Sequence, residues 1–372
     1  MNLKSCWICC FLCMTLIFPG IAVSAKSEKG QKTAENYFSA GERYYYEKNY
    51  KSAIDEFTRA VQLDSRKADA YTMRGSSYYM LREYKLALND ANTAIELNHE
   101  YWRNYYLRGL VYQSLKDYEK AIGDFSKVIE LNNEYDDGYF QRAHSHYLAG
   151  NLNDAIADFS KAIDLNSTND VAYNIRGWCY FRLEQSEKAL ADYDKAIQIR
   201  QHAQHYSNRA VVYARSNKYE KAITDIDKAI SLNPKKPEFY SRCVLICILS
   251  NSIDKASLCA DEAIKLAPDK PDTYKDRGSV YFEKGLYKSA INDFEKALNI
   301  INDNTGKDFI YLNIAESYYH LKQVDRSKEY YLKACKLNPN FNNDFSKWPK
   351  DYIFSDKDKR TIPEMLSKYG KY

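Results

Sequence analysis

The sequence lacks the short motifs that indicate catalysis. It contains no phosphate-binding GxxxxGKS or GxxxxGKT loop, no zinc-binding HExxH helix and no GxSxG nucleophile turn. His202 and His205 are three residues apart and could share one helix face, but the sequence offers no further metal ligands near them. We therefore expect a protein that is not an enzyme and that has no cofactor and no metal site.

Two further absences restrict the kinds of partner. Acidic and basic residues are interspersed along the chain, with 54 Lys and Arg against 50 Asp and Glu, so no strongly basic segment indicates binding to nucleic acid or acidic lipid. After residue 25 no apolar run approaches the roughly 20 residues that a membrane-spanning helix needs. We expect no nucleic-acid partner and no stable membrane insertion of the mature chain.

One apolar run is present, at the N-terminus. Lys4 precedes the apolar stretch 6–18, which is followed by Pro19-Gly20 and by small residues up to Ala25. This order is typical of a secretory signal peptide. We predict a signal peptide at 1–25 and export to a periplasmic or extracellular location, with retention of the segment as an anchor as the alternative. Residues 26–33 are predicted to be a polar linker.

From residue 34 the chain repeats itself. The segment RGSSYYMLREYKLALNDANTAIELN at 74–98 recurs as RGLVYQSLKDYEKAIGDFSKVIELN at 108–132, an offset of 34 residues. Within each unit a small residue recurs at position 8, alanine at 20 and 27, and an aromatic ring usually at 11 and 24. Spacings of three and four predict two amphipathic helices per unit, with a tight turn at position 15 or 16. The small residues would let the helices approach closely, and the rings would fill the gaps between them.

This pattern resembles the tetratricopeptide repeat family, over about nine units at 34–341. The resemblance implies an all-α fold in which antiparallel helix hairpins stack into a right-handed superhelical solenoid, with the first helix of each unit on the concave side. It also implies a scaffold that binds a peptide or a protein segment in the concave groove. An accessory subunit of an envelope assembly or of an envelope enzyme complex is the alternative. The unit at 237–270 keeps least of the pattern.

The C-terminal segment at 342–372 does not continue the repeat. It contains DFSKWPKDYIF, which is too aromatic for a solvated tail. Because the terminal units of a solenoid need a polar outer layer, we predict a cap over the last repeat. An autoinhibitory segment that lies in the groove is the alternative.

Aromatic residues are frequent at positions 2, 5, 9 and 12 of the first helices, on a face that could meet a ligand. Rigid rings suit peptide recognition because they lose little entropy on binding. The alternative is that the rings only pack between successive first helices. The predicted partner-binding residues are Tyr79, Tyr106, Phe140, Tyr147, Trp178 and Phe181, with Trp178 as the strongest candidate. Some family members bind acidic C-termini through a clamp of Lys, Asn and Arg, but no three successive units match it, so that specificity is not expected.

Positions 7 and 23 hold Arg and Asp in the same six units, and the two positions lie at similar heights on facing helices. We therefore predict a repeated ion pair between the helices of each unit, modest in strength where it is exposed. In the unit at 237–270 the same positions hold Cys243 and Cys259. We predict a disulfide between these two cysteines. The alternatives are two buried thiols, or a bond to Cys247, one helical turn from Cys243.

Overall fold

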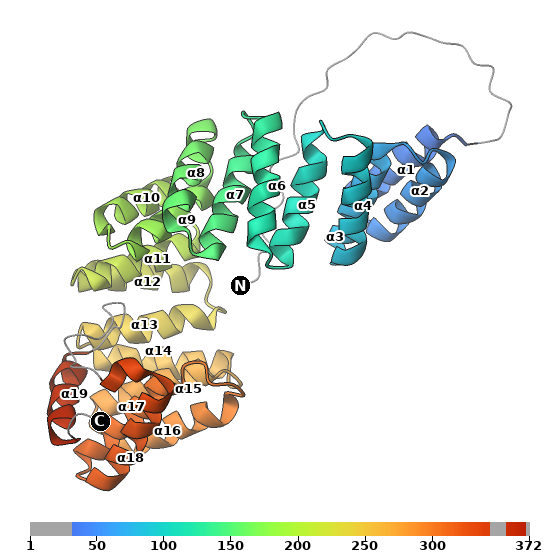
Figure 1. Cartoon of the computed structure of the whole chain (residues 1–372). Coiled ribbons are helices and arrows are strands. Elements are labelled where there is room, and N and C mark those ends of the chain that lie inside the picture. Colours follow the sequence, from blue (N-terminus) through green and yellow to red (C-terminus); the bar gives the residue numbers. More distant parts are fainter. Residues whose placement is uncertain (1–31, 343–354, 370–372) are drawn as a thin grey trace.

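Each repeat of the sequence forms one pair of antiparallel helices in the computed structural model (Figure 1). The structure describes residues 32–342 and 355–369. The predicted signal peptide at 1–25 and most of the predicted linker at 26–33 lie outside the described residues. Within the described parts of the chain, nine helix hairpins are followed by one terminal helix. The prediction of an all-α solenoid of about nine hairpins is confirmed.

The first helices of the nine hairpins line up along the chain. They are α1 (Ala34–Tyr46), α3 (Ala68–Met80), α5 (Trp102–Ser114), α7 (Asp136–Ala149), α9 (Asp170–Arg182), α11 (Ala203–Arg215), α13 (Pro237–Leu249), α15 (Pro271–Glu283) and α17 (Lys307–His320). The second helices are α2 (Tyr50–Leu63), α4 (Tyr84–Leu97), α6 (Tyr118–Leu131), α8 (Leu152–Leu165), α10 (Ser186–Ile199), α12 (Tyr219–Leu232), α14 (Ile253–Leu266), α16 (Tyr287–Ile300) and α18 (Val324–Leu337). The short 3₁₀ helix η1 (Pro339–Asn342) and the terminal helix α19 (Asp356–Tyr369) complete the described elements.

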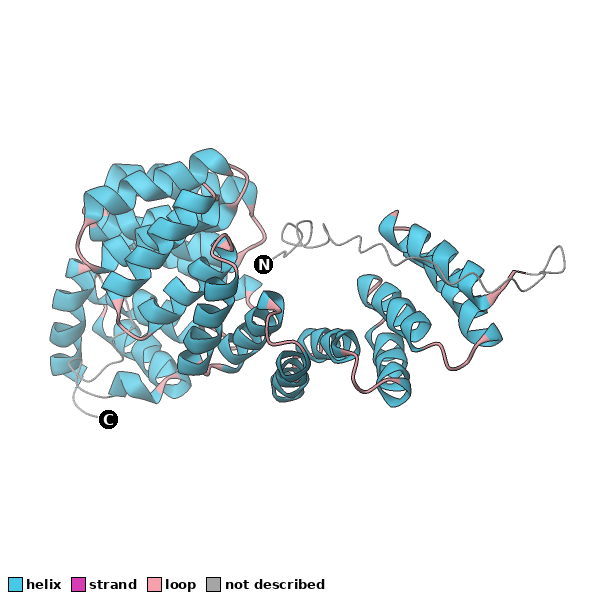
Figure 2. Ribbon diagram, turned by 90° about the horizontal axis from the view of Figure 1, so that it is seen from above, coloured by secondary structure: helices cyan, strands magenta, loops and turns pink. Residues whose placement is uncertain are grey.

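The hairpins stack in chain order. Each second helix packs against its own first helix and, up to α16, against the first helix of the next hairpin. Most successive first helices also touch. Figure 2 shows that short loops join the helices along the stack. In Figure 1 the stack changes direction between α12 and α13, so its two ends do not lie on one straight axis.

The small residue at position 8 allows the two helices of a hairpin to touch. A Cβ atom added at Gly278 would lie 2.6 Å from the ring of Phe294, and one added at Gly41 would lie 2.6 Å from the ring of Phe57. Both rings are fully buried. A side chain at these glycines would have to displace a packed ring, which explains why position 8 is glycine or alanine in eight of the nine units. The exception is Val244, in the unit at 237–270.

The turn between the two helices adopts the same backbone conformation in every hairpin. Position 15 of each unit has a positive φ, between 56° at Asn217 and 89° at Gly150. This left-handed conformation is easiest for glycine and asparagine. The predicted tight turn therefore lies at position 15, and it reverses the chain within a few residues.

The predicted ion pairs between positions 7 and 23 form in all six units that have both residues. They are Arg74–Asp90, Arg108–Asp124, Arg142–Asp158, Arg176–Asp192, Arg209–Asp225 and Arg277–Asp293. Each is bidentate, with N–O distances of 2.7–3.0 Å. They are not surface pairs, because the aspartate side chains are only 2–12% exposed. We therefore expect the loss of one partner of such a pair to destabilise the protein more than the loss of one partner of a surface ion pair would.

Each of these arginines also reaches the second helix of the preceding hairpin, which the sequence analysis did not predict. Arg108 donates to Asn92 Oδ1 at 3.0 Å, and Arg176 donates to Ser160 Oγ at 2.9 Å. The acceptors all occupy position 25 of the preceding unit. One guanidinium therefore joins three helices and fixes the spacing between hairpins as well as the spacing within one.

Candidate functional site

The six predicted partner-binding residues lie on α3, α5, α7 and α9. Five of them are partly buried, and Phe181 is only 7% exposed. All six pack against buried residues of the hairpins, in three hydrophobic clusters along these helices. They therefore take part in helix packing, and a role of their exposed edges in partner contact stays a prediction.

The two tyrosines at the start of this row link successive first helices. The Tyr106 hydroxyl donates to Asp137 on α7, and the Tyr79 hydroxyl accepts from Ser114 Oγ on α5 at 3.3 Å. Burial, together with the neighbouring Asp137 carboxylate, raises the pKa of Tyr106 well above its usual value. Burial also raises the pKa of Tyr79. Both phenols therefore stay neutral and act as hydrogen-bonding groups near neutral pH.

The other four rings lie in two local groups, one on α7 and one on α9. His144 lies between Phe140 and Tyr147 on α7, with ring centroids 6.3 Å and 6.2 Å apart. Burial lowers the pKa of His144 to about 4, so this stack is uncharged at neutral pH. On α9, Trp178 and Phe181 lie with their centroids 5.3 Å apart. The structure thus places the predicted rings in neighbouring groups along the helices, without joining them into one pocket.

A row of polar contacts between first helices was missed by the sequence analysis. It joins position 6 of one first helix to position 5 of the preceding one. Asn208 Nδ2 donates to Asn174 Oδ1 at 3.0 Å, and Arg242 Nη1 donates to Ser207 Oγ at 2.7 Å. The next contact in the row joins the Ser241 hydroxyl to the Asp276 carboxylate, whose pKa burial raises to about 6. The row therefore runs from α9 to α15.

Arg242 differs from the six arginines at position 7, each of which forms an ion pair. Its Nη1 donates to Ser207 Oγ and, at 2.8 Å, to Asn208 Oδ1. Within the described residues it makes no ion pair with a carboxylate, and burial lowers its pKa. Glu238, one turn earlier on α13, is paired instead with Lys270 at 2.8 Å.

Two positions of the acidic-peptide clamp are matched after all. Asn208 and Arg242 occupy position 6 of two successive units, as the clamp requires, and the structure places them in contact. No three successive units match the whole clamp, and the match of these units at two of its positions was missed by the sequence analysis. The other clamp positions are not matched, because Trp178 and Glu238 stand where asparagine and lysine would be needed.

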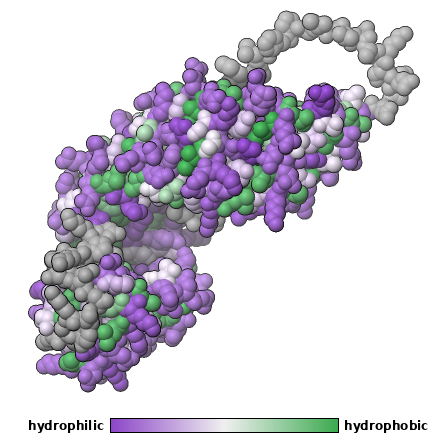
Figure 3. Space-filling view, in the orientation of Figure 1, coloured by the Kyte–Doolittle hydropathy of each residue, from purple (hydrophilic) through white to green (hydrophobic). Residues whose placement is uncertain are grey.

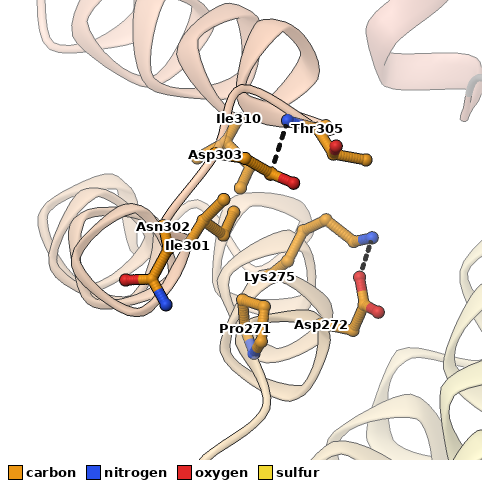
Figure 4. A pocket seen from close by; sticks show the side chains of 9 residues that line it. Pro271, Asp272, Lys275, Ile301, Asn302, Asp303, Thr305 and Ile310 are labelled. Carbon is orange, nitrogen blue, oxygen red and sulfur yellow. Dashed lines mark hydrogen bonds and ion pairs between the residues drawn. The ribbon is translucent and has the colours of Figure 1, made fainter.

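A surface depression elsewhere in the stack is a weaker candidate for a binding site, because its polar groups already bond to one another. A depression of about 430 Å³ lies between α15 and the loop before α17 (Figure 4). Its polar groups bond to one another: Lys275 Nζ lies 2.6 Å from Asp272 Oδ1, and the Thr305 N–H donates to Asp303 Oδ1. In the described part of the chain no group of three or more His, Cys, Asp or Glu side chains could hold a metal ion.

The predicted disulfide pair lies between α13 and α14. The structure joins Cys243 and Cys259 by a disulfide, with Cα atoms 6.2 Å apart, a separation that suits such a bond. Cys247 is buried and free, and its Sγ lies 3.8 Å from that of Cys243. The cysteines thus occupy the place that an Arg–Asp ion pair has in the neighbouring hairpins.

On the face shown in Figure 3, small hydrophobic areas alternate with hydrophilic ones along the stack. No helix in the described ranges is both long and apolar enough to span a bilayer.

Family models described as tetratricopeptide repeat match most of the chain. The matched segments are 38–96, 103–135, 136–169, 171–202, 203–236, 272–304 and 310–341. They leave out the whole unit at 237–270, which contains the disulfide. A curated relative, the uncharacterized protein ycf37 of Guillardia theta, is 34% identical over 70 residues, a match that spans 18% of this chain and only 39% of that protein.

Several solved structures are similar. The structure of the hetero-tetramer Cut9–Hcn1 of APC/C is 12% identical, with a TM-score of 0.56 over 90% of this chain and 76% of that chain. This likeness shows the fold alone. YrrB, described as a TPR protein with an unusual peptide-binding site, is 25% identical over 48% of this chain and 92% of its own, with a TM-score of 0.43. Together with the nine observed hairpins, the family matches identify the chain as a scaffold for protein–protein interaction that belongs to the tetratricopeptide repeat family.

Proposed function

We propose that this protein is an exported scaffold that binds an acidic peptide segment of a partner protein in its concave groove. The observation that carries the proposal is Arg242, a half-buried cation on a first helix without a carboxylate partner in the described residues. The six arginines at position 7 are each neutralised by an aspartate on the facing helix. Arg242 is bonded only to neutral oxygen atoms in the described structure, so its charge is available to a ligand.

The surroundings of Arg242 favour a carboxylate as that ligand. Ser207 and Asn208 hold one guanidinium nitrogen, which fixes the orientation of the group. A planar guanidinium can bind a carboxylate through two parallel hydrogen bonds, and such bonds strengthen where water is excluded. Asn174 and Asn208 provide amide groups beside it that could bond to a peptide backbone. An Asp or Glu side chain, or a C-terminal carboxylate, would satisfy this arrangement.

Replacement of Arg242 by glutamine is expected to weaken binding of acidic peptides. The loss should be about 30-fold or more, because removal of one partner of a buried charge pair costs about 2 kcal/mol or more. Binding can be measured by fluorescence anisotropy with two matched sets of labelled peptides, one containing Asp and Glu and one containing Asn and Gln in their place. Arg59→Gln is the control, because Arg59 is an exposed cation on a second helix. Equal binding of the acidic and neutral sets would contradict the proposal.

Export is supported by the N-terminal segment, which has the order of a signal peptide. We expect the mature protein to begin at Lys26 and to be found outside the cytoplasm. N-terminal sequencing of the protein from fractionated cells would test this expectation. A mature protein that keeps Met1 and fractionates with the cytoplasm would contradict export but would leave the peptide-binding proposal standing.

A further inference from the structure

The terminal helix α19 folds back along the stack instead of extending it. A helix added as the next repeat would pack mainly on α18, as α13 packs mainly on α12, whereas the more extensive contact of α19 is with α17. Lys357 of α19 instead reaches the hairpin before: its Nζ donates to the Phe282 carbonyl at 2.7 Å, at the C-terminal end of α15. It also lies over the rings of Phe282 and Tyr287, 4.7 Å and 4.9 Å from their centroids. In Figure 1, α19 lies beside α17.

The position of Lys357 is chemically favourable. The last carbonyls of a helix have no partner within the helix and carry partial negative charge, so an ammonium group stabilises that end. The two rings offer their faces to the same cation. Lys357 is therefore a specific contact between α19 and α15.

Two apolar side chains anchor the rest of α19. Ile362 and Met365 are fully buried, in a cluster with Leu312 and Ala315 of α17 and with Tyr331 of α18. Leu312 occupies position 5 of its unit. In α5 and α7 this position holds two of the predicted partner-binding rings, Tyr106 and Phe140. On the last hairpin, α19 therefore covers the helix position that these rings occupy in the earlier hairpins.

One buried group opposes this docking. Glu316 of α17 is 1% exposed, and its Oε1 has no hydrogen-bond partner in the described structure. The charged groups around it are Asp358 of α19 and Glu283 of α15, which repel a carboxylate, and Lys357, which attracts it. Burial of a carboxyl group without a partner is costly, and burial is the first cause that raises the pKa of Glu316. Pro363 lies within α19 and removes one helical hydrogen bond, which weakens the helix on its own.

We infer that the surface of α15 and α17 that α19 covers is a binding site for a helix, and that α19 occupies this site as an internal ligand. An amphipathic helix of a partner protein, with a lysine and apolar residues spaced as in α19, competes with α19 for it. Such a helix has a lysine followed by apolar residues five and eight positions later, as Lys357, Ile362 and Met365 are spaced. The inference rests on the proposed function in that both concern the inner face of the stack. The sites differ, because Arg242 lies on α13.

The full-length protein and a labelled synthetic peptide of residues 355–369 test this inference. The variant Ile362→Glu/Met365→Glu should release α19 and open the surface. The peptide should then bind the variant about tenfold or more tightly than the wild type, in which the surface is mostly occupied. Amide exchange within 356–369 should be about tenfold or more faster in the variant, while exchange in α1 to α14 stays unchanged. The control Glu364→Gln alters an exposed residue of α19 and should behave as the wild type.

A second variant tests the same surface without disturbing its apolar contacts. Glu316→Gln should tighten the docking of α19 and slow its amide exchange at pH 7. Added to the released variant, it should also tighten binding of the peptide, which uses the same surface. Because the pKa of Glu316 is raised when α19 is docked, the contribution of Glu316 to docking should be most favourable at low pH and be lost as the pH rises. Asp358, whose pKa burial raises to about 6, acts in the same direction, whereas His320, whose pKa burial lowers and which contacts Thr361 of α19, acts in the opposite one. The preference of docking for low pH should be smaller in Glu316→Gln.

The outcomes separate this inference from the proposed function. The increase in peptide binding that follows release of α19 should be the same when Arg242 is replaced by glutamine, because the surface on α15 and α17 does not include that residue. Failure of acidic peptides to bind at Arg242 would leave this result unaffected. If the peptide binds neither the wild type nor the released variant, or binds both equally, α19 is a fixed cap and not an exchangeable ligand.

Discussion

Replacement of Arg108 by methionine is expected to lower the free energy of unfolding by about 3–5 kcal/mol, because it leaves a buried carboxylate without its partner. The side chain of Asp124 is 8% exposed and accepts two hydrogen bonds of 2.8 Å from Arg108. Burial already raises the pKa of Asp124 despite the arginine, which opposes that rise. Without Arg108 the carboxylate must be protonated or hydrated, and the contact to Asn92 on the preceding hairpin is lost as well.

The chain contains a natural control for this experiment. In the last hairpin the same two positions hold Ile314 and Tyr330, which pack in one hydrophobic cluster. The double variant Arg108→Ile/Asp124→Tyr should therefore recover much of the loss, since an apolar pair can replace a buried ion pair at little cost. Urea unfolding followed by circular dichroism would measure both variants. A single variant that loses less than about 1 kcal/mol would show that solvent screens the pair as it screens a surface one.

The hairpins and their ion pairs could be predicted because the sequence repeats each requirement. Position 8 must be small where Phe57 or Phe294 lies against it, and Arg and Asp appear and disappear together at positions 7 and 23. One unit with this pattern would have been weak evidence. When nine units are aligned, the positions that vary from unit to unit can be told apart from the positions at which packing requires the same type of residue.

The contacts between hairpins could not be predicted in the same way. The bond from Arg108 to Asn92 depends on how far one hairpin is turned relative to the next, and that angle does not appear in the spacing of residues. The position of α19 likewise depends on side chains that occur once, such as Lys357 and Ile362. The repeated spacing of small, aromatic and charged residues determines how the two helices of each hairpin pack. Side chains that occur only once determine where the last helix lies.

The residues of the candidate binding site could also be predicted only in part from the sequence. The aromatic rings at positions 5, 9 and 12 do pack between helices, and packing and ligand contact use the same residue types, so sequence alone could not separate the two roles. Position 6 changes from Asn208 to Arg242 to Asp276 in successive units, which gives no recurring pattern. Only the structure shows that Arg242 contacts Asn208 and forms no ion pair with a described carboxylate.

Replacement of both Cys243 and Cys259 by alanine is expected to lower the free energy of unfolding by about 3 kcal/mol, the chain-entropy estimate for a loop of this length. The two cysteines are 16 residues apart in the sequence, and both are buried. The unit they close lies outside the family matches and has lost the ion pair of its neighbours. A covalent link therefore replaces the charge pair in the hairpin whose packing pattern is weakest. Urea unfolding with and without a reductant measures the effect: reductant should destabilise the wild type and leave the double variant unchanged.

The variant Cys243→Arg/Cys259→Asp is the matched control, because it restores the residues that six other hairpins use at these positions. If the cysteines substitute for the ion pair, this variant should be more stable than the double alanine variant and insensitive to reductant. The guanidinium should also reach Asp227, which occupies position 25 of the preceding unit, as the other arginines reach that position. Asp227 is now paired with Lys255 at 2.6 Å and would have to be shared. Peptide mapping of the non-reduced protein completes the test. A Cys259 that is free, or that is linked to Cys247, would show that the cysteines do not take the place of the ion pair.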